Sequence, residues 1–176
     1  MRQVTKLLIT VISGFYLACL LMPGLEEHLY LNRYLVFNSG EYWRLLTVAL
    51  THGGLAHLFF NMYALLVLGN SLESAIGQKK FLSIFVISQI GASFASIYFG
   101  AINVVSVGAS GAIFGLFGAM IVLSKKYGLE TKSTYVIVGI NFVIGFIFPG
   151  IDWHAHLGGL ISGFIAASVL LAPARS

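Results

Sequence analysis

Residues 81–123 read FLSIFVISQIGASFASIYFGAINVVSVGASGAIFGLFGAMIVL and contain no charged side chain. At a rise of about 1.5 Å per residue, a single helix of this length would be about twice as long as the hydrocarbon core of a bilayer is thick. The run therefore has to fold back on itself, and the glycine-bounded stretch 100–108 is the natural break. We expect one membrane-spanning helix over about 81–99 and another over about 110–124.

The composition of the whole chain also indicates a membrane protein. Of its 176 residues, 58% are hydrophobic and only 9% are charged, with a mean hydropathy of +0.92, whereas about a quarter of the residues of a soluble domain are charged. This length fits one domain, residues 1–176, made of several spanning helices. The net charge of +4 does not indicate a nucleic-acid partner, because the basic residues lie in short groups between apolar stretches, as membrane anchors in contact with lipid do.

Charges, glycines and prolines define the borders of four further spans. They are expected over 7–25, over about 52–70, over 133–148, and from the turn at 149–152 to Pro173. The first span could also be a cleaved signal peptide, but its apolar run is longer than that of a typical signal peptide and no clear cleavage site follows it. A retained helix is favoured. The predicted fold class is all-α, a polytopic bundle of six transmembrane helices.

The basic residues also predict the orientation. Eight of the ten lie on the side of the two termini, and only Arg33 and Arg44 lie on the opposite side. The positive-inside rule then places both termini in the cytoplasm. Residues Ser110 and His156 consequently enter their helices from the same outer side. Since no organelle-targeting extension precedes the first span, the expected location is the membrane of a prokaryotic cell.

Two reactive side chains begin helices in this plan. Ser110 is framed by Gly108 and Gly111, and His156 begins the last span. A hydroxyl and an imidazole are unfavourable in hydrocarbon unless they have a function, so we interpret the pair as a nucleophile and its general base. Ser110 lies about 22 Å of helix above Lys125 at the inner interface, which is less than the roughly 30 Å hydrocarbon thickness. We therefore expect a water-filled cavity that opens to the outer side.

Further polar and aromatic groups are expected around that cavity. His57 and Asn61 lie four residues apart and would share one helix face. Both can donate hydrogen bonds to the negative oxygen of a tetrahedral intermediate, as can the backbone N–H of Ser110 at its helix N-terminus. Phe114, one turn below Ser110, is placed to pack against the imidazole of His156. In the alternative interpretation, His57 and Asn61 only join helices by hydrogen bonds.

Small residues predict the close helix packing that would join the two reactive groups. Gly111 and Gly115 form a small-xxx-small pair in the fourth span, and Gly159 and Gly163 form another in the last. Such faces let helix backbones approach closely in lipid. This packing could bring the Ser110 hydroxyl within hydrogen-bond reach of the histidine.

Other polar residues are given structural roles. Ser93 and Ser96, like most serines of the apolar helices, are expected to bond back to their own turn. Asp152 is interpreted as a helix-start residue and not as a partner that orients His156. His52 is expected to be structural.

These motifs together resemble the rhomboid family of intramembrane serine proteases in its basic six-helix form. The matching residues are Trp43-Arg44, His52, His57-x-x-x-Asn61, Gly108-x-Ser110-Gly111 and Ala155-His156-x-x-Gly159-x-x-x-Gly163. The resemblance implies a Ser110–His156 dyad without a third acidic member, and an oxyanion site made by His57, Asn61 and the Ser110 amide. It also implies a first loop that lies partly in the membrane, and substrates that enter laterally as transmembrane helices.

The predicted function is that of an enzyme, a serine endopeptidase that cleaves transmembrane segments through an acyl-enzyme and needs no cofactor or metal. One alternative is a non-catalytic rhomboid relative that binds membrane proteins. Such relatives typically lack the serine or the histidine, and both are present here. The other alternative is a metal binder or transporter that uses His52, His57, His154 and His156. The absence of a carboxylate from every predicted span argues against transport.

Overall fold

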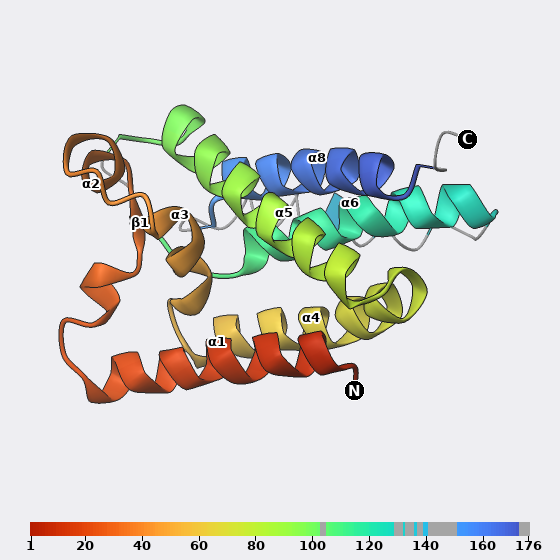
Figure 1. Ribbon diagram of the computed structural model, residues 1–176. Coiled ribbons are helices and arrows are strands. Elements are labelled where there is room, and N and C mark those ends of the chain that lie inside the picture. Colours follow the sequence, from red (N-terminus) through yellow and green to blue (C-terminus); the bar gives the residue numbers. More distant parts are fainter. Residues whose placement is uncertain (103–104, 129–131, 133–135, 137–138, 141–150, 173–176) are drawn as a thin grey trace.

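The computed structural model of this protein describes residues 1–102, 105–128, 132, 136, 139–140 and 151–172 (Figure 1). Helices make up almost all of the regular structure. In chain order the elements are α1 (Gln3–Leu21), η1 (Glu26–His28), β1 (Leu31–Asn32), α2 (Arg33–Asn38), α3 (Arg44–Thr47), η2 (Val48–Leu50), α4 (Leu55–Ile76), α5 (Gln78–Phe99), β2 (Val105–Ser106), α6 (Ser110–Tyr127) and α8 (Trp153–Leu170).

Four of the described helices, α1, α4, α5 and α8, are long and apolar enough to cross a membrane. The fifth long helix, α6, carries Lys125 and Lys126 in its last turn and contacts α4, α5 and α8. Figure 1 shows that α5 ends, and α6 and α8 begin, toward the end of the molecule that carries β1, whereas α6 and α8 end toward the other end. The prediction of an all-α polytopic membrane protein is confirmed.

The charge-free run folds back as expected, because α5 ends at Phe99 and α6 begins at Ser110. Most of the predicted span over 133–148 lies outside the described residues.

The predicted borders of the first two spans are wrong by several residues. Helix α1 begins at Gln3 and not at residue 7, and α4 continues to Ile76 and not to residue 70. The longer α4 includes Glu73, whose carboxylate accepts hydrogen bonds from the backbone N–H groups of Val4 at 3.1 Å and Thr5 at 2.8 Å. Glu73 therefore acts as the N-terminal cap that α1 lacks in its own sequence. The expectation that no carboxylate lies within a span is corrected by this residue.

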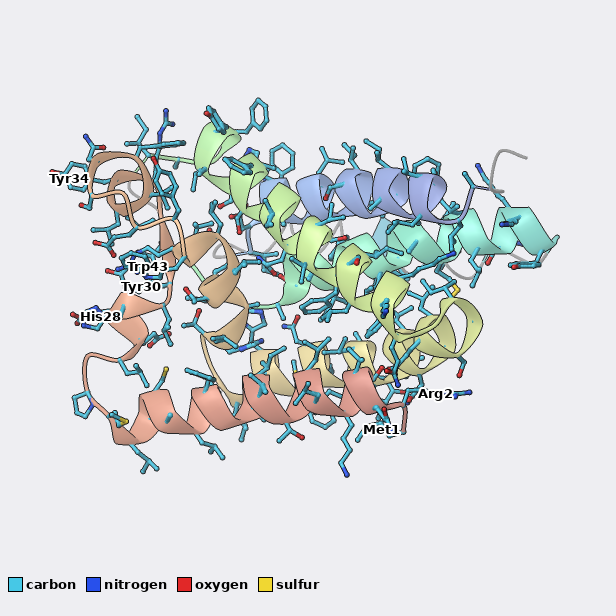
Figure 2. The ribbon with its side chains drawn as sticks, viewed as in Figure 1. Met1, Arg2, His28, Tyr30, Tyr34 and Trp43 are labelled. Atoms are coloured by element: carbon cyan, nitrogen blue, oxygen red, sulfur yellow. The ribbon has the colours of Figure 1, made fainter. Side chains whose placement is uncertain are left out.

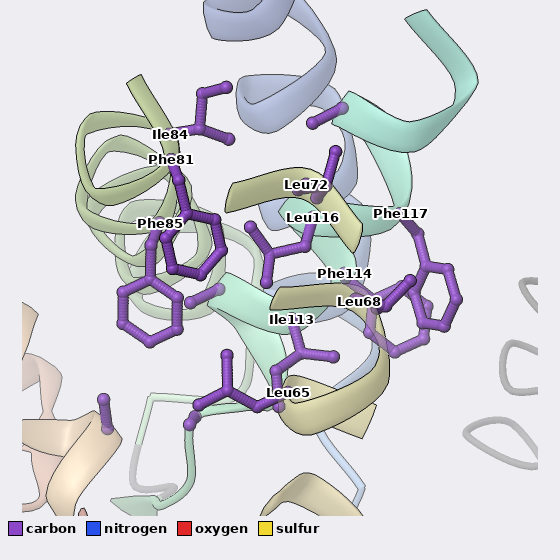
Figure 3. Packing of buried hydrophobic residues seen from close by; sticks show 14 of the residues in the cluster. Leu65, Leu68, Leu72, Phe81, Ile84, Phe85, Ile113, Phe114, Leu116 and Phe117 are labelled. Carbon is purple, nitrogen blue, oxygen red and sulfur yellow. The ribbon is translucent and has the colours of Figure 1, made fainter. Parts of the chain in front are cut away.

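The apolar core lies where α4, α5 and α6 meet. Its fully buried side chains include Leu65, Leu72, Phe81, Ile84 and Leu116, which point toward one another in Figure 3. This packing is non-directional and is stabilised by burial of apolar surface. It gives α6 a fixed position inside the bundle.

The connection between α1 and α4 is folded around a buried arginine. Arg44 is only 2% exposed, and its guanidinium donates hydrogen bonds to the backbone oxygens of Glu27 and Tyr30, each at 2.8 Å. The neighbouring Trp43 donates its indole N–H to the backbone oxygen of His28, and Figure 2 shows Trp43, Tyr30 and His28 together at one end of the molecule. Arg44 therefore positions this connection, and is more than an anchor at the membrane surface.

A short antiparallel pair joins this first connection to the one between α5 and α6. In β1 and β2, Leu31 pairs with Ser106 and Asn32 pairs with Val105. The segment that leads into Ser110 is thus attached to the first connection by backbone hydrogen bonds.

Candidate active site

Ser110 is the first residue of α6 and follows a tight turn. Gly108 in this turn has a φ of +114°, and a Cβ atom there would lie 2.9 Å from Cε1 of His57. Only glycine fits both the conformation and the space. The N–H of Gly108 donates to the backbone oxygen of Val48 at 3.0 Å, which fixes the turn against η2.

The hydroxyl of Ser110 meets the imidazole of His156 at the start of α8. The distance between Ser110 Oγ and His156 Nε2 is 3.0 Å, although the residues are 46 positions apart in the chain. This is a normal hydrogen-bond distance, with Oγ as the donor when Nε2 is unprotonated. His156 is 7% exposed, and within the described part of the chain its Nδ1 atom has no hydrogen-bond partner.

Phe114 holds the imidazole from one side. Its ring lies parallel to that of His156, with centroids 4.0 Å apart and an angle of 10° between the planes. Phe114 itself is 4% exposed and packs among the core side chains shown in Figure 3. The stack restricts rotation of the imidazole and keeps Nε2 directed at the serine.

The two helices approach closely through the predicted glycines, and α6 and α8 run side by side in Figure 1. A Cβ atom on Gly159 would overlap the backbone oxygen of Gly111, and one on Gly163 would overlap the backbone of Gly115. Close approach of this kind is possible only where side chains are absent. It explains why Ser110, next to Gly111, can reach the histidine on α8.

His57 is placed beside the turn that carries Ser110. Its Nδ1 atom lies 3.4 Å from the N–H of Gly53, which leaves Nε2 to carry the hydrogen in the neutral ring. A Cβ atom on Gly108 would lie 3.0 Å from that Nε2. The donor of His57 therefore faces the backbone that leads into the serine.

Asn61 lies one turn further along α4 and is 7% exposed. Its side-chain amide donates to the backbone oxygen of His57 at 2.9 Å. One of the two amide hydrogens is used in this bond, and the second is left for another acceptor.

Comparison with known proteins gives the chain its family. The family model described as the Rhomboid domain matches residues 39–173. The chain belongs to the rhomboid family. It is 44% identical over 140 residues to the "Rhomboid protease GluP" of Bacillus subtilis (strain 168), covering 77% of this chain and 27% of that protein.

Two plant relatives show the range of the family. The chain is 39% identical over 158 residues to "RHOMBOID-like protein 5" of Arabidopsis thaliana, covering 85% of this chain and 50% of the relative. It is 38% identical over 138 residues to "Inactive RHOMBOID-like protein 8" of the same plant, covering 74% of this chain and 39% of the relative. The rhomboid chain described here therefore spans half or less of the length of these three relatives. It is an integral, multi-pass membrane protein, as its family and its apolar helices require.

The other histidines of this rhomboid protein lie outside the dyad. His52 is 4% exposed, and its ring packs edge-on against those of Tyr16 and His57, with centroids 6.4 Å and 5.1 Å away. His154 lies beside Asp152, at 3.7 Å between Nδ1 and Oδ1. Among the residues that the structure describes, no group of three or more His, Cys, Asp or Glu side chains could hold a metal ion. The metal-binding alternative therefore has no ligand set in this part of the chain.

One group beside the dyad was missed by the sequence interpretation. Asp152 caps α8 as expected, since its Oδ1 accepts the N–H of Ala155 at 3.0 Å. Its Oδ2 also accepts hydrogen bonds from the hydroxyls of Ser96 and Ser106. The expectation that Ser96 bonds back to its own turn is wrong, and so is that for Ser93, which donates to the backbone oxygen of Leu45 at 2.8 Å.

The sequence contained a signal for this group. Ser96 lies one turn before the end of its helix, and Ser106 and Asp152 lie in the two segments that enter α6 and α8. In the predicted helix plan, all three positions fall toward the outer side of the bundle. Polar side chains in an apolar bundle pair with one another when they share a depth.

Proposed function

We propose that this rhomboid protein is an intramembrane serine endopeptidase that cleaves transmembrane segments of membrane proteins. Ser110 is the nucleophile and His156 is the general base. The observation that carries the proposal is the 3.0 Å contact between Ser110 Oγ and His156 Nε2, which joins two helices of the bundle. The similarity to a relative named as a rhomboid protease supports it.

In the proposed reaction, Nε2 of His156 accepts the proton of the Ser110 hydroxyl while Oγ attacks a peptide carbonyl carbon. The carbonyl oxygen becomes negative in the tetrahedral intermediate. The imidazolium then gives its proton to the leaving amine, and the peptide bond breaks to leave an acyl-enzyme. Water attacks this ester with His156 again as the base, which restores the free serine and releases the second product.

The negative oxygen needs donors that are already in place. The N–H of Ser110 has no partner within its own helix, and the helix dipole favours an anion at this position. His57 supplies a ring N–H beside the turn, and the second amide hydrogen of Asn61 is a further donor. Fixed donors of this kind stabilise the transition state strongly where water is excluded.

The substrate has to present an unwound peptide. A regular helix keeps its carbonyl groups hydrogen-bonded, and in lipid no water replaces those bonds. Transmembrane segments with small or helix-breaking residues near the scissile bond are therefore the proposed substrates. They enter laterally from the membrane lipid, which contacts the apolar outer faces of the helices.

The proposed orientation has both termini in the cytoplasm and the site open to the outer side of a prokaryotic membrane. Eight of the ten basic residues lie in segments on the side of the termini, which supports this orientation through the positive-inside rule.

The test compares wild type with Ser110→Ala, His156→Ala and the control Ser168→Ala in proteoliposomes that contain a generic transmembrane substrate. Ser168 is an exposed serine of α8 whose hydroxyl bonds to Phe164 in its own helix. We expect wild type and the control to form product and to react with a fluorophosphonate, and the two dyad variants to do neither. Product that persists in Ser110→Ala would overturn the proposal. If wild type binds the substrate but forms no product and is not labelled, the non-catalytic alternative is favoured. One relative of the chain is named as inactive.

A further inference from the structure

Asp152, Ser96 and Ser106 form a compact polar cluster at the outer end of the bundle. The carboxylate Oδ2 accepts the Ser106 hydroxyl at 2.6 Å and the Ser96 hydroxyl, and the two hydroxyl oxygens are 2.9 Å apart. Ser96 is 7% exposed and the Asp152 side chain is 19% exposed. The cluster joins the end of α5, strand β2 and the start of α8.

Two residues of this cluster lie close in sequence to the two residues of the dyad. Ser106 precedes Ser110 by four residues, and Asp152 precedes His156 by four residues. The backbone of Ser106 is paired with Leu31 of β1, so the segment between Ser106 and Ser110 is also attached to the first connection. Asp152 is thus bonded both to the segment that carries the nucleophile and to the helix that carries the base.

The glycine contacts between α6 and α8 do not fix this geometry alone. Close backbone contact sets how near the two helices come, and it is made within the helices, not by the segments that enter them. Hydrogen bonds from a carboxylate are directional and act at one position. The cluster therefore links the segments that enter α6 and α8 at one point, close in sequence to both residues of the 3.0 Å contact.

We propose that Asp152, through the hydroxyls of Ser96 and Ser106, is a positioning residue that sets the register of Ser110 against His156. It touches neither the substrate nor the reacting atoms. The proposal rests on the serine protease function proposed above. It assigns to Asp152 a role beyond that of a helix cap.

Conservative substitutions separate this role from capping. In Asp152→Asn the remaining oxygen still accepts the N–H of Ala155, because asparagine caps helices about as well as aspartate. The new NH₂ group cannot accept the serine hydroxyls and can only donate to their oxygens, so that charge-assisted bonds are replaced by weaker neutral ones. At position 106, Ser106→Thr keeps a hydroxyl and Ser106→Val has almost the same shape without one, and both residues favour a strand.

The measurements are the rate constant of fluorophosphonate labelling, which needs no peptide substrate, and kcat and KM for a transmembrane substrate. We expect Asp152→Asn and Ser106→Val to lower labelling and kcat at least tenfold with KM within about twofold of wild type, since small errors of position act on rate. Ser106→Thr should restore both rates to within about twofold. The double variant of Asp152→Asn with Ser106→Val should lose little more than the slower single variant, because both substitutions act on the bond between Ser106 and Asp152.

The control is Ser88→Ala, a buried serine of the same helix as Ser96 whose hydroxyl bonds to Ile84 in its own turn. If Asp152→Asn and Ser106→Val are labelled and cleave substrate as fast as this control, the positioning role is overturned. It is also overturned if the losses of rate in the two single variants multiply in the double variant. Equally slow labelling of Ser106→Val and Ser106→Thr would also overturn the positioning role. Failure of the protease function is seen separately, as a wild type that is neither labelled nor active.

Discussion

Replacement of Gly159 by alanine should separate the dyad directly. A Cβ atom at this position would overlap the backbone oxygen of Gly111 and lie 2.8 Å from its carbonyl carbon. Non-bonded carbon atoms pack at about 3.5–4.0 Å, so the backbones have to move apart by about 1 Å. Gly111 follows Ser110, and Gly159 lies one turn after His156. The displacement therefore acts within one turn of both reactive groups.

The expected effect follows from the distance between the reactive atoms. The contact of Ser110 Oγ with His156 Nε2 is 3.0 Å, and a displacement of about 1 Å takes it beyond hydrogen-bond range. A misplacement of this size can lower an enzymatic rate about 100-fold. Overpacking of the helix contact should also lower the free energy of unfolding by about 1–3 kcal/mol.

The assay measures fluorophosphonate labelling of Ser110 and substrate cleavage below the thermal transition of each variant. The matched control is Gly14→Ala on α1, where a Cβ atom would meet nothing within 4 Å. This control should keep the wild-type rate, and its stability should be unchanged or raised by up to about 1 kcal/mol, as expected for glycine to alanine in a helix. A labelling rate of Gly159→Ala within twofold of the control would refute the argument that close glycine packing holds the dyad together.

Three further substitutions test the groups around this centre. Glu73→Gln should lower the free energy of unfolding by about 1–3 kcal/mol, seen as a lower thermal transition, because the new NH₂ group would face the backbone N–H of either Val4 or Thr5 in place of an acceptor. Phe114→Leu should slow labelling about two- to tenfold, because the ring stack on His156 contributes about 0.5–1.5 kcal/mol. His57→Leu should lower kcat about 100- to 1,000-fold with little change in KM, because a donor to the negative oxygen is removed.

Each of these substitutions has a matched control. Glu26→Gln changes an exposed glutamate of η1, Phe117→Leu changes a buried aromatic residue one turn from Phe114, and His28→Leu changes an exposed histidine of the first connection. Equal stability of the two glutamine variants would contradict the capping role of Glu73. Equal labelling rates of the two leucine variants of α6 would contradict the role of the stack. Unchanged kcat in His57→Leu would remove that residue from the oxyanion site.

Much of the architecture could be predicted from the sequence because hydropathy and glycine spacing are local signals. The charge-free run had to fold back, and its break between Phe99 and Ser110 was predicted correctly. The depth and sidedness of Ser110 and His156, which rest on counting helices between groups of basic residues, stay predictions. Their roles in catalysis remain predictions, which the contact between the two side chains supports.

The helix borders and the polar pairs depended on tertiary structure. Glu73 lies 68 residues from Thr5, and nothing in either segment shows that one would cap the other. The contact of Ser96 with Asp152 likewise joins residues 56 positions apart. A serine in an apolar helix can bond to its own turn at no conformational expense, so local reasoning favours that choice wherever the tertiary partner is unknown.

The two carboxylates whose tertiary contacts local reasoning missed have a common physical explanation. Glu73 accepts N–H groups from the start of α1, and Asp152 accepts an N–H group from the start of α8. The first N–H groups of a helix have no partner in their own helix, and in lipid water cannot supply one. A carboxylate beside a helix start therefore satisfies donors whose burial would otherwise be unfavourable, and the helix dipole stabilises its charge. At the end of the bundle that holds Ser110, Asp152 has a second carboxylate oxygen, which accepts a hydrogen bond from Ser106 in the segment that leads to the nucleophile. In the arrangement that we propose, Asp152 thus both caps α8 and positions the dyad.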